Sequence, residues 1–274
     1  MSFSRCYNKD GNISFLRNPD NRGAMAVKQW VDNILCSSAV GHVIAMVTGG
    51  VVPIYGLRID TRSSVVSPQV PAQLLWRIYE SAELRLLDRY LCITECIVEL
   101  GTSLGVVASA AARRLPAGGR FIGVEANPEL IEIAYCNITR NAPAIDTEVI
   151  HGAIDYSSPR GSSVMFSSNS SHTASKLMQA TADGEFSAPV IRLGNLLRER
   201  GITDYVLIMD IEGAEAGLLL RDPQSLTLCR QILVELHNTE YDSQPYTCTE
   251  LRSRIEELGF RVKAQYGNVM VFNR

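Results

Sequence analysis

The chain has 274 residues, a formal net charge of −3, 46% hydrophobic residues and 20% charged residues. This composition is typical of a globular protein with a sizeable core, and its acidic balance excludes the basic footprint of a nucleic-acid-binding protein. The length predicts one large domain, or one domain with an N-terminal extension.

Cysteine usage points to a reducing compartment. The chain has seven cysteines, an odd number, and none forms a C-x-x-C pair. Cys92 and Cys96 are four positions apart, but no second pair or nearby histidine completes a zinc-ligand set. The first twelve residues are polar and lack the apolar core of a signal peptide. We therefore expect reduced thiols in a cytoplasmic protein.

Residues 1–66 are predicted to form an N-terminal extension. The stretch 34–57 has no formal charge, but its glycines and Pro53 break it into short β-branched runs. We expect two or three short strands there, including a β-hairpin that turns at Gly49-Gly50, and no membrane span.

Residues 67–274 are predicted to form the main domain. One helix is expected over 68–91, because apolar side chains recur there at helical spacing. Strands and helices then alternate. Strands are expected at 96–100, 119–125, 147–154, 205–211 and 231–237, and helices at 104–115, 128–141, 215–220 and 251–260. Two final strands flank a Gly267-Asn268 turn. This pattern predicts an α/β fold: a doubly wound, mostly parallel sheet with an antiparallel last strand.

A serine-rich segment interrupts the alternation at residues 157–189. Eight of the fifteen residues from Ser157 to Ser171 are serine. The segment is either a flexible surface insertion or a lid or acceptor loop, because long loops inside compact α/β domains are often functional.

The turn after the first parallel strand has a partial nucleotide-binding pattern. Gly101 and Gly105 give G-x-x-x-G, with Ser103 in place of the middle glycine that a dinucleotide fingerprint requires. This turn suits a smaller anionic group, such as an amino-acid carboxylate, at the helix N-terminus. Glu99 favours a partly cationic ligand and would repel a pyrophosphate.

The second parallel strand ends in another candidate ligand residue. Glu125 follows Gly105 by 20 positions, where a carboxylate can accept hydrogen bonds from both ribose hydroxyls. Ala126 and Asn127 follow, and Asn127 is a plausible helix cap before Pro128. The alternative is an ordinary cap with a solvated Glu125. His151, at the third strand end, is either near the nucleoside base or a surface histidine.

Two later strand ends carry acids and a histidine. Asp210 and Glu212 follow the fourth parallel strand at the carboxyl edge, where ligands bind in such sheets, whereas we expect Glu215 to act only as a helix cap. Glu235 and His237 are two positions apart at the fifth strand, so they are expected on one face. With Asp210 they could form a base relay or a weak metal site; a surface pair is the alternative.

Together, residues 98–105, 123–128, 150–154, 208–215 and 233–237 resemble the FkbM-type S-adenosylmethionine-dependent methyltransferases in motif, order and spacing. The resemblance covers roughly residues 68–274. It implies a seven-stranded Rossmann-like sheet with an antiparallel last strand. It also implies O-methylation of a sugar, a glycan or a natural-product scaffold. The acidic charge balance predicts no nucleic-acid partner. The N-terminal 60 residues match no common core of the family, so the hairpin there could serve acceptor binding or contacts in a homo-oligomer.

The resemblance also implies residue roles. Gly101, Ser103 and Gly105 would cradle the methionine end of the cofactor, with Glu99 close by. Glu125, with Ala126 and Asn127, would hold the ribose. The Gly152–Ala153 backbone would contact the adenine, while Tyr79 and Glu80 match a Tyr-Glu pair upstream of the first motif. Asp210 and Glu212 would face the methyl group or the acceptor.

We expect His237 or Asp210 to be the catalytic base, with Glu235 beside them; a divalent metal could assist instead. The family usually has Asn at the position of Ser103 and commonly Lys at that of Ile208. This second departure removes a charge pairing within the strand. A nicotinamide-dependent oxidoreductase and a non-catalytic relative of the fold are the rival interpretations.

Overall fold

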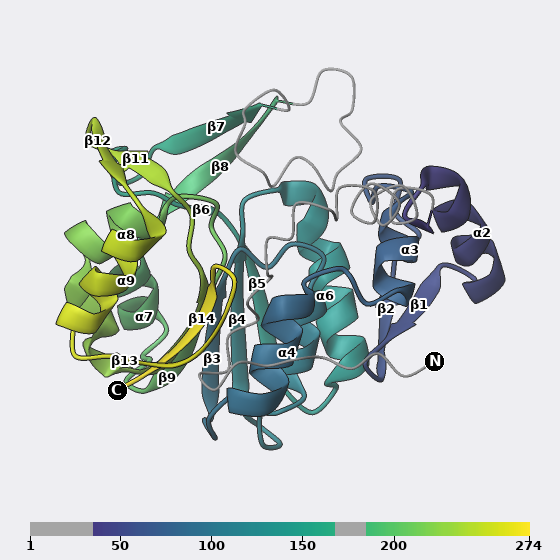
Figure 1. Ribbon diagram of the computed structural model, residues 1–274, viewed down its shortest axis with the longest axis horizontal. Helices are drawn as coiled ribbons and strands as arrows, with labels where there is room; N and C mark the ends of the chain where they lie inside the picture. The colour runs from purple at the N-terminus through teal and green to yellow at the C-terminus, as the bar shows by residue number, and fades with distance from the viewer. Residues whose placement is uncertain (1–34, 168–184) are drawn as a thin grey trace, which may run out of the picture.

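The computed structural model describes residues 35–167 and 185–274, and its centre is one seven-stranded sheet (Figure 1). The strand order is β13-β14-β10-β9-β3-β4-β5. The strands are β3 (Cys96–Leu100), β4 (Arg120–Glu125), β5 (Asp146–His151), β9 (Tyr205–Met209), β10 (Cys229–Glu235), β13 (Arg261–Tyr266) and β14 (Val269–Asn273). Neighbouring strands from β5 to β10 pair in parallel, and β14 pairs antiparallel with both β10 and β13. The predicted α/β sheet and its antiparallel last strand are confirmed.

Helices cover both faces of this sheet (Figure 1). One layer holds α4 (Ser81–Tyr90), α5 (Val106–Ala112) and α6 (Pro128–Asn141); the other holds α7 (Leu193–Glu199), α8 (Glu215–Arg221), the 3-10 helix η3 (Pro223–Leu228) and α9 (Cys248–Glu257). The core accordingly has two hydrophobic clusters, and alternate residues of a strand enter different ones: Ile97 packs in one and Val98 in the other.

The N-terminal extension is partly helical, which corrects the prediction of strands before Gly49. Residues 38–48 form α2 (Ser38–Thr48), in which the Ser37 side chain accepts a hydrogen bond from the Val40 N–H. Gly49 has left-handed dihedral angles and caps the helix C-terminus. The Gly-Gly pair therefore ends a helix. The hairpin lies after it, as β1 (Val51–Ile54) and β2 (Leu57–Asp60), and turns at Tyr55-Gly56.

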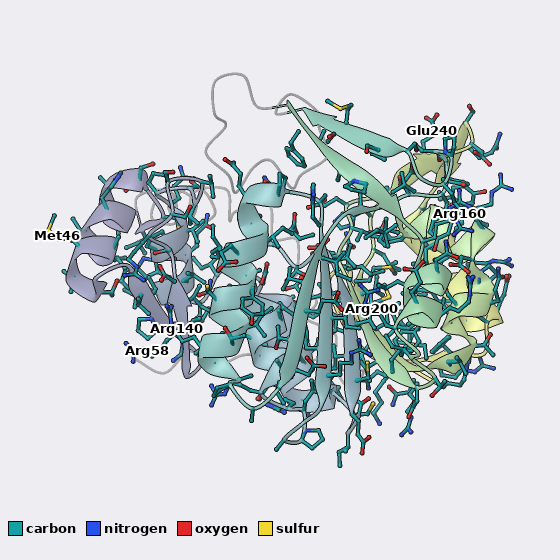
Figure 2. The ribbon with its side chains drawn as sticks, turned by 180° about the vertical axis from the view of Figure 1, so that it is seen from behind. Met46, Arg58, Arg140, Arg160, Arg200 and Glu240 are labelled. Carbon is teal, nitrogen blue, oxygen red and sulfur yellow. The ribbon has the colours of Figure 1, made fainter. Side chains whose placement is uncertain are left out.

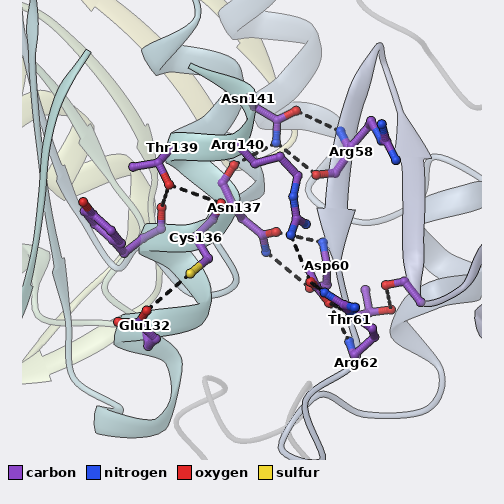
Figure 3. A network of polar contacts seen from close by, with 12 residues as sticks. Arg58, Asp60, Thr61, Arg62, Glu132, Cys136, Asn137, Thr139, Arg140 and Asn141 are labelled. Carbon is purple, nitrogen blue, oxygen red and sulfur yellow. Dashed lines mark hydrogen bonds and ion pairs between the residues drawn. The ribbon is translucent and has the colours of Figure 1, made fainter. Parts of the chain in front are cut away.

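Two asparagines of α6 attach this hairpin to the helical layer on one face of the main sheet (Figure 3). The Asn137 side chain accepts a hydrogen bond from the Asp60 N–H at 2.7 Å, and the Asn141 side chain accepts one from the Arg58 N–H at 2.9 Å. Their amide groups also donate to the carbonyls of the same two residues. The side chains thus satisfy the exposed edge of β2, as a neighbouring strand would. The domain boundary at residue 66 stays a prediction.

The single helix predicted over 68–91 is wrong, because the structure has two. They are α3 (Val70–Leu75) and α4, and between them Arg77 and Glu80 have positive φ angles of 58° and 45°. Left-handed dihedrals cannot continue a right-handed helix. The break brings Tyr79 and Glu80 to the end of β3 instead of leaving them within a helix.

The serine-rich segment contains strands where a loop was expected. Strands β7 (Ser163–Ser167) and β8 (Glu185–Ile191) pair antiparallel, and β6 (Ala153–Ile154) pairs in parallel with β8. The predicted strand over 147–154 is therefore divided at Gly152, where the chain leaves the main sheet. The rest of the segment, 168–184, lies outside the described residues, so its role as a lid or acceptor loop stays a prediction.

The carboxyl ends of β3, β4, β5, β9 and β10 meet at one edge of the sheet, and the strand order reverses between β3 and β9. Ligands bind at such a point in open α/β sheets. Across the described ranges, no helix is both long and apolar enough to span a bilayer.

Candidate active site

The turn after β3 is held against β9 by Gly101. Its φ angle is +86°, and a Cβ atom there would lie 1.9 Å from the Asp210 carbonyl oxygen. Only glycine allows the two backbones to approach this closely. The turn after β3 and the end of β9, which carry two of the predicted motifs, are therefore in direct backbone contact.

Ser103 joins the turn after β3 to the end of β4. Its backbone N–H donates to Glu125 Oε2 at 2.7 Å, and its Oγ lies 3.2 Å from the Tyr79 hydroxyl. Ser103 has a φ angle of 50°, a left-handed conformation that asparagine adopts more readily than serine. Of the described non-glycine residues with positive φ, Glu80, Ser103 and Glu212 all lie at this edge. Such strain concentrates at functional sites.

The Glu125 carboxylate is held rigidly at the end of β4. Besides the bond from Ser103, its Oε1 accepts from the Asn127 N–H at 2.8 Å, and its residue is only 7% exposed. Burial raises the pKa of Glu125, while the backbone N–H groups of Asn127 and Ser103 oppose the rise. Each oxygen receives one backbone bond and keeps a second lone pair. This arrangement fits a ribose diol as ligand.

Among the described residues, three carboxyl groups beside this turn each have a buried oxygen without a hydrogen-bond partner. The atoms are Glu80 Oε2, Glu99 Oε2 and Asp210 Oδ1. Burial, and then the charges of Glu83 and Asp210, raise the pKa of Glu80 well above the ordinary value. Burial, and then the charge of Glu80, do the same for the pKa of Glu99. Unpartnered buried carboxyls are costly unless a ligand satisfies them. A cationic ligand such as the ammonium of an amino acid fits this position.

His237 lies among three carboxylates. Its Nε2 is 3.4 Å from Glu212 Oε2 and 3.9 Å from Asp210 Oδ1, and its Nδ1 is 3.1 Å from Glu215 Oε1. Burial lowers the pKa of His237, but the hydrogen bond and charge of Glu215, with Asp210 and Glu212, outweigh it and raise the value to about 9. Burial and the charges of Glu235 and Glu212 raise the pKa of Asp210 to about 8.

Glu235 has a different partner from His237, so the prediction that they share one face is wrong. Strand β10 ends at Glu235, and the alternation of the strand does not reach His237. Glu235 forms a hydrogen bond with Glu83 of α4, whereas His237 meets Glu215 of α8 in the other helical layer. Burial, then this contact, raises the pKa of Glu83 to about 7. Glu235 still acts on Asp210 through its charge.

The predicted adenine contact is partly occupied by internal bonds. The Gly152 N–H donates to the Glu125 carbonyl at 2.9 Å, so it is not available to a base. Ala153 pairs with Val190 of β8, and His151 Nε2 lies 3.1 Å from the Ala126 carbonyl oxygen. The role of Ala153 toward an adenine stays a prediction.

A divalent cation would also find ligands here. One donor atom each from Asp210, Glu212 and His237 lies within 4.8 Å of the others. Carboxylate oxygens and an imidazole nitrogen suit several divalent metals. Glu215 would then orient the imidazole from behind through Nδ1, as outer partners of metal-binding histidines do.

Two residues of the site were missed by sequence reasoning. Glu215 was expected only to cap a helix, yet it is fully buried against His237. Its spacing of five residues from Asp210, with a histidine just beyond the next strand, was the available signal. Glu83 sits on the apolar side of an ordinary amphipathic helix, 7% exposed, and no local pattern marks it.

Comparisons with known proteins identify a family for the chain. A family model described as the methyltransferase FkbM domain matches residues 99–262. No curated protein sequence shows significant similarity to the chain.

Solved structures with a related arrangement share little sequence with the chain. The pyocyanin biosynthetic protein PhzM is 14% identical, with a TM-score of 0.40; the match covers 76% of this chain and 58% of that one. The O-methyltransferase TomG from Streptomyces achromogenes, solved with S-adenosylmethionine, is 16% identical, with a TM-score of 0.39. The match covers 69% of this chain and 75% of that one. A ribosomal protein L11 methylase from Lactobacillus delbrueckii subsp. bulgaricus is 13% identical, with a TM-score of 0.39. The match covers 80% of this chain and 85% of that one.

Proposed function

Because the chain belongs to the FkbM family of S-adenosylmethionine-dependent methyltransferases, we propose that it methylates a hydroxyl oxygen of a sugar, a glycan or a natural-product scaffold. The proposal that the methyl group goes to an oxygen rests on the position of His237, which lies beside Asp210 and Glu212 at the ligand edge. A hydroxyl is a weak nucleophile until a base takes its proton, and a histidine among carboxylates is suited to that task.

The residues around Glu125 and Glu99 fit the cofactor. Glu125 would hold the ribose hydroxyls, and the partnerless oxygens of Glu80 and Glu99 would receive the ammonium of its methionine part. When bound, the cofactor supplies a methyl group on a sulfonium, which needs no further activation. The protein's task is then to orient the acceptor oxygen and exclude water, which contributes up to about 7–11 kcal/mol in ideal cases.

The proton of the acceptor would move to His237 or Asp210. Glu215 accepts from Nδ1 and so directs Nε2 toward Asp210 and Glu212. With a pKa of about 9, His237 is protonated at neutral pH, and Asp210, with a pKa of about 8, is mostly protonated there. A bound sulfonium adds positive charge and lowers both values. Binding of the cofactor would therefore help to free the base.

The test is transfer of a labelled methyl group to a panel of hydroxyl-bearing sugars and natural products. Asp210→Asn and His237→Ala should each lower turnover by about 10²–10⁴-fold while cofactor binding remains, as expected for loss of a general base. Near-native turnover in both variants would refute this assignment of the base. Transfer to amines but not to hydroxyls would refute O-methylation.

A metal-assisted route is the second candidate, because the donor atoms of Asp210, Glu212 and His237 lie so close together. A divalent cation can lower the pKa of a bound hydroxyl without a protein base. Activity that disappears in a chelator and returns with magnesium would favour this route. Activity that is unchanged in the chelator would favour His237 or Asp210 as the base.

A further inference from the structure

A second candidate ligand site lies away from the ligand edge, where α7, η3 and α8 come together. It is a cavity of about 540 Å³ with four arginines and one acid in its lining. The charged residues are Arg160, Arg192, Arg198, Arg221 and Asp222. None of the lining residues belongs to the candidate active site. Arg160 lies on the side of the molecule that carries these helices (Figure 2).

Among the residues that the structure describes, three of these guanidinium groups have no acidic partner. The ion pairs found within 35–167 and 185–274 include Arg221, with Asp242, but not Arg160, Arg192 or Arg198. Arg160 and Arg198 are exposed and Arg192 is partly buried, so three cations that lack an acidic partner in the described ranges line one cavity. An anionic ligand would provide the missing charge.

The acid in the lining is already satisfied by the fold. Asp222 Oδ2 accepts from the Tyr156 hydroxyl and from the Gly194 N–H, both at 2.8 Å. The Tyr156 oxygen in turn accepts from the Leu193 N–H at 3.1 Å. Asp222 therefore binds Tyr156 and Gly194 of the cavity lining, and no ion pair within the described residues joins it to an arginine.

Arg192 is held in place between Tyr156 and Ser158 of the serine-rich segment. Its Nη2 donates to the Ser158 carbonyl at 3.1 Å, and its guanidinium lies 5.6 Å from the Tyr156 ring centroid. Its Nε is buried and has no partner among the described residues. Arg192 and Arg160 also line a neighbouring hollow of about 190 Å³. These two side chains therefore line two neighbouring spaces for a ligand.

The size and the walls of the cavity indicate the class of ligand. A volume of about 540 Å³ is typical of small-molecule sites and exceeds what one phosphate needs. Leu197, Ile202 and Leu228 give it an apolar side, and Leu228 is 46% exposed. Guanidinium groups match phosphate oxygens in charge and in paired hydrogen-bond geometry. We propose that this cavity binds a phosphorylated small organic molecule, with Arg160, Arg192 and Arg198 on its phosphate groups.

The test is calorimetric titration of the full chain with pyrophosphate, ADP and adenosine, in the presence of saturating S-adenosylhomocysteine to occupy the nucleoside site. Pyrophosphate and ADP should bind saturably, more weakly as salt rises, and adenosine should not. Tighter binding of ADP would show that the apolar wall contributes, and equal binding that the phosphates alone determine affinity; both outcomes support the proposal.

Variants show whether the binding is at this cavity. Arg160→Gln and Arg198→Gln should each weaken ADP binding by about tenfold, as for loss of a charge-assisted hydrogen bond. Arg230→Gln removes the same charge from an exposed arginine paired with Asp204 and should change little. No saturable binding at millimolar pyrophosphate or ADP, equal binding of adenosine, or native affinity in both variants would overturn the proposal. Failure of S-adenosylhomocysteine to bind would contradict the proposed methyl transfer, and the pyrophosphate titration would still report on the cavity.

Discussion

The Nδ1 atom of His237 lies 3.1 Å from Oε1 of Glu215, a carboxylate with no exposed surface. This contact links the end of β10 to the first turn of α8 and stabilises a protonated imidazole. It also directs Nε2 toward Asp210 and Glu212. The position and the proton affinity of the proposed base are therefore set by a residue that would not touch the substrate.

Glu215→Gln should lower the pKa of His237 from about 9, because the neutral amide no longer stabilises the imidazolium. The measurement is an NMR titration of the imidazole protons, with the His237 signal assigned by its loss in His237→Asn. In an assay of methyl transfer to an accepted hydroxyl substrate, the acid limb of the pH–rate profile should shift to lower pH. An unchanged His237 pKa in Glu215→Gln, or an equal shift in the exposed control Glu240→Gln, would contradict this role.

Glu83→Gln should stabilise the protein at pH 8 by about 1–3 kcal/mol relative to the native chain. Burial and Glu235 raise the pKa of Glu83 to about 7 in the folded state, so the native state binds more protons than the unfolded one above pH 4.5. Stability is therefore lost as pH rises from about 4.5 through 7, and a neutral amide removes that loss. Urea unfolding at pH 5 and pH 8 checks this. A gain that is the same at both pH values, or no gain, would count against it.

Glu125→Gln should weaken S-adenosylhomocysteine binding by roughly ten- to hundredfold, because the site loses charge-assisted bonds to the ribose. The variant also disturbs the bond from the Ser103 N–H. Calorimetry gives the affinity, and Glu129→Gln in the exposed first turn of α6 is the control. Affinity within twofold of the native value would place the ribose elsewhere.

Gly101→Ala should destabilise the fold and weaken cofactor binding, since its Cβ would lie 1.9 Å from the Asp210 carbonyl oxygen. Gly118 is a matched control: its φ angle is +79°, but nothing lies within 4 Å of an added Cβ. Gly118→Ala should cost only the strain of a left-handed alanine, about 1–2 kcal/mol. Equal losses in urea unfolding for both variants would show that the backbone contact at Asp210 is unimportant.

The sheet was predictable because its strands are continuous apolar runs separated by amphipathic helices and glycine turns. Glu125, Asp210 and Glu212 were predictable for the same reason, since each stands at the end of such a run. The helix at Ser38–Thr48 was not, because its β-branched residues favour strands, and the caps at Ser37 and Gly49 decided its conformation.

Contacts between elements distant in sequence were beyond sequence reasoning. Glu83 and Glu235 are brought together by packing of α4 against the sheet, and their spacing carries no signal. The two left-handed residues that divide α3 from α4 are Arg77 and Glu80, which are ordinary helix formers. The arginine cavity likewise combines residues from the segment after β6 and from α7, η3 and α8.

The central claim is that this sheet edge holds S-adenosylmethionine. Its most direct test is calorimetric titration of the full chain with S-adenosylmethionine, S-adenosylhomocysteine and NAD. The account predicts one saturable site for both sulfur compounds, weakened in Glu125→Gln, and no binding of NAD. Binding of NAD with no affinity for either sulfur compound would indicate an oxidoreductase, and no binding of any of the three would indicate a non-catalytic relative of the fold; either result would contradict the claim.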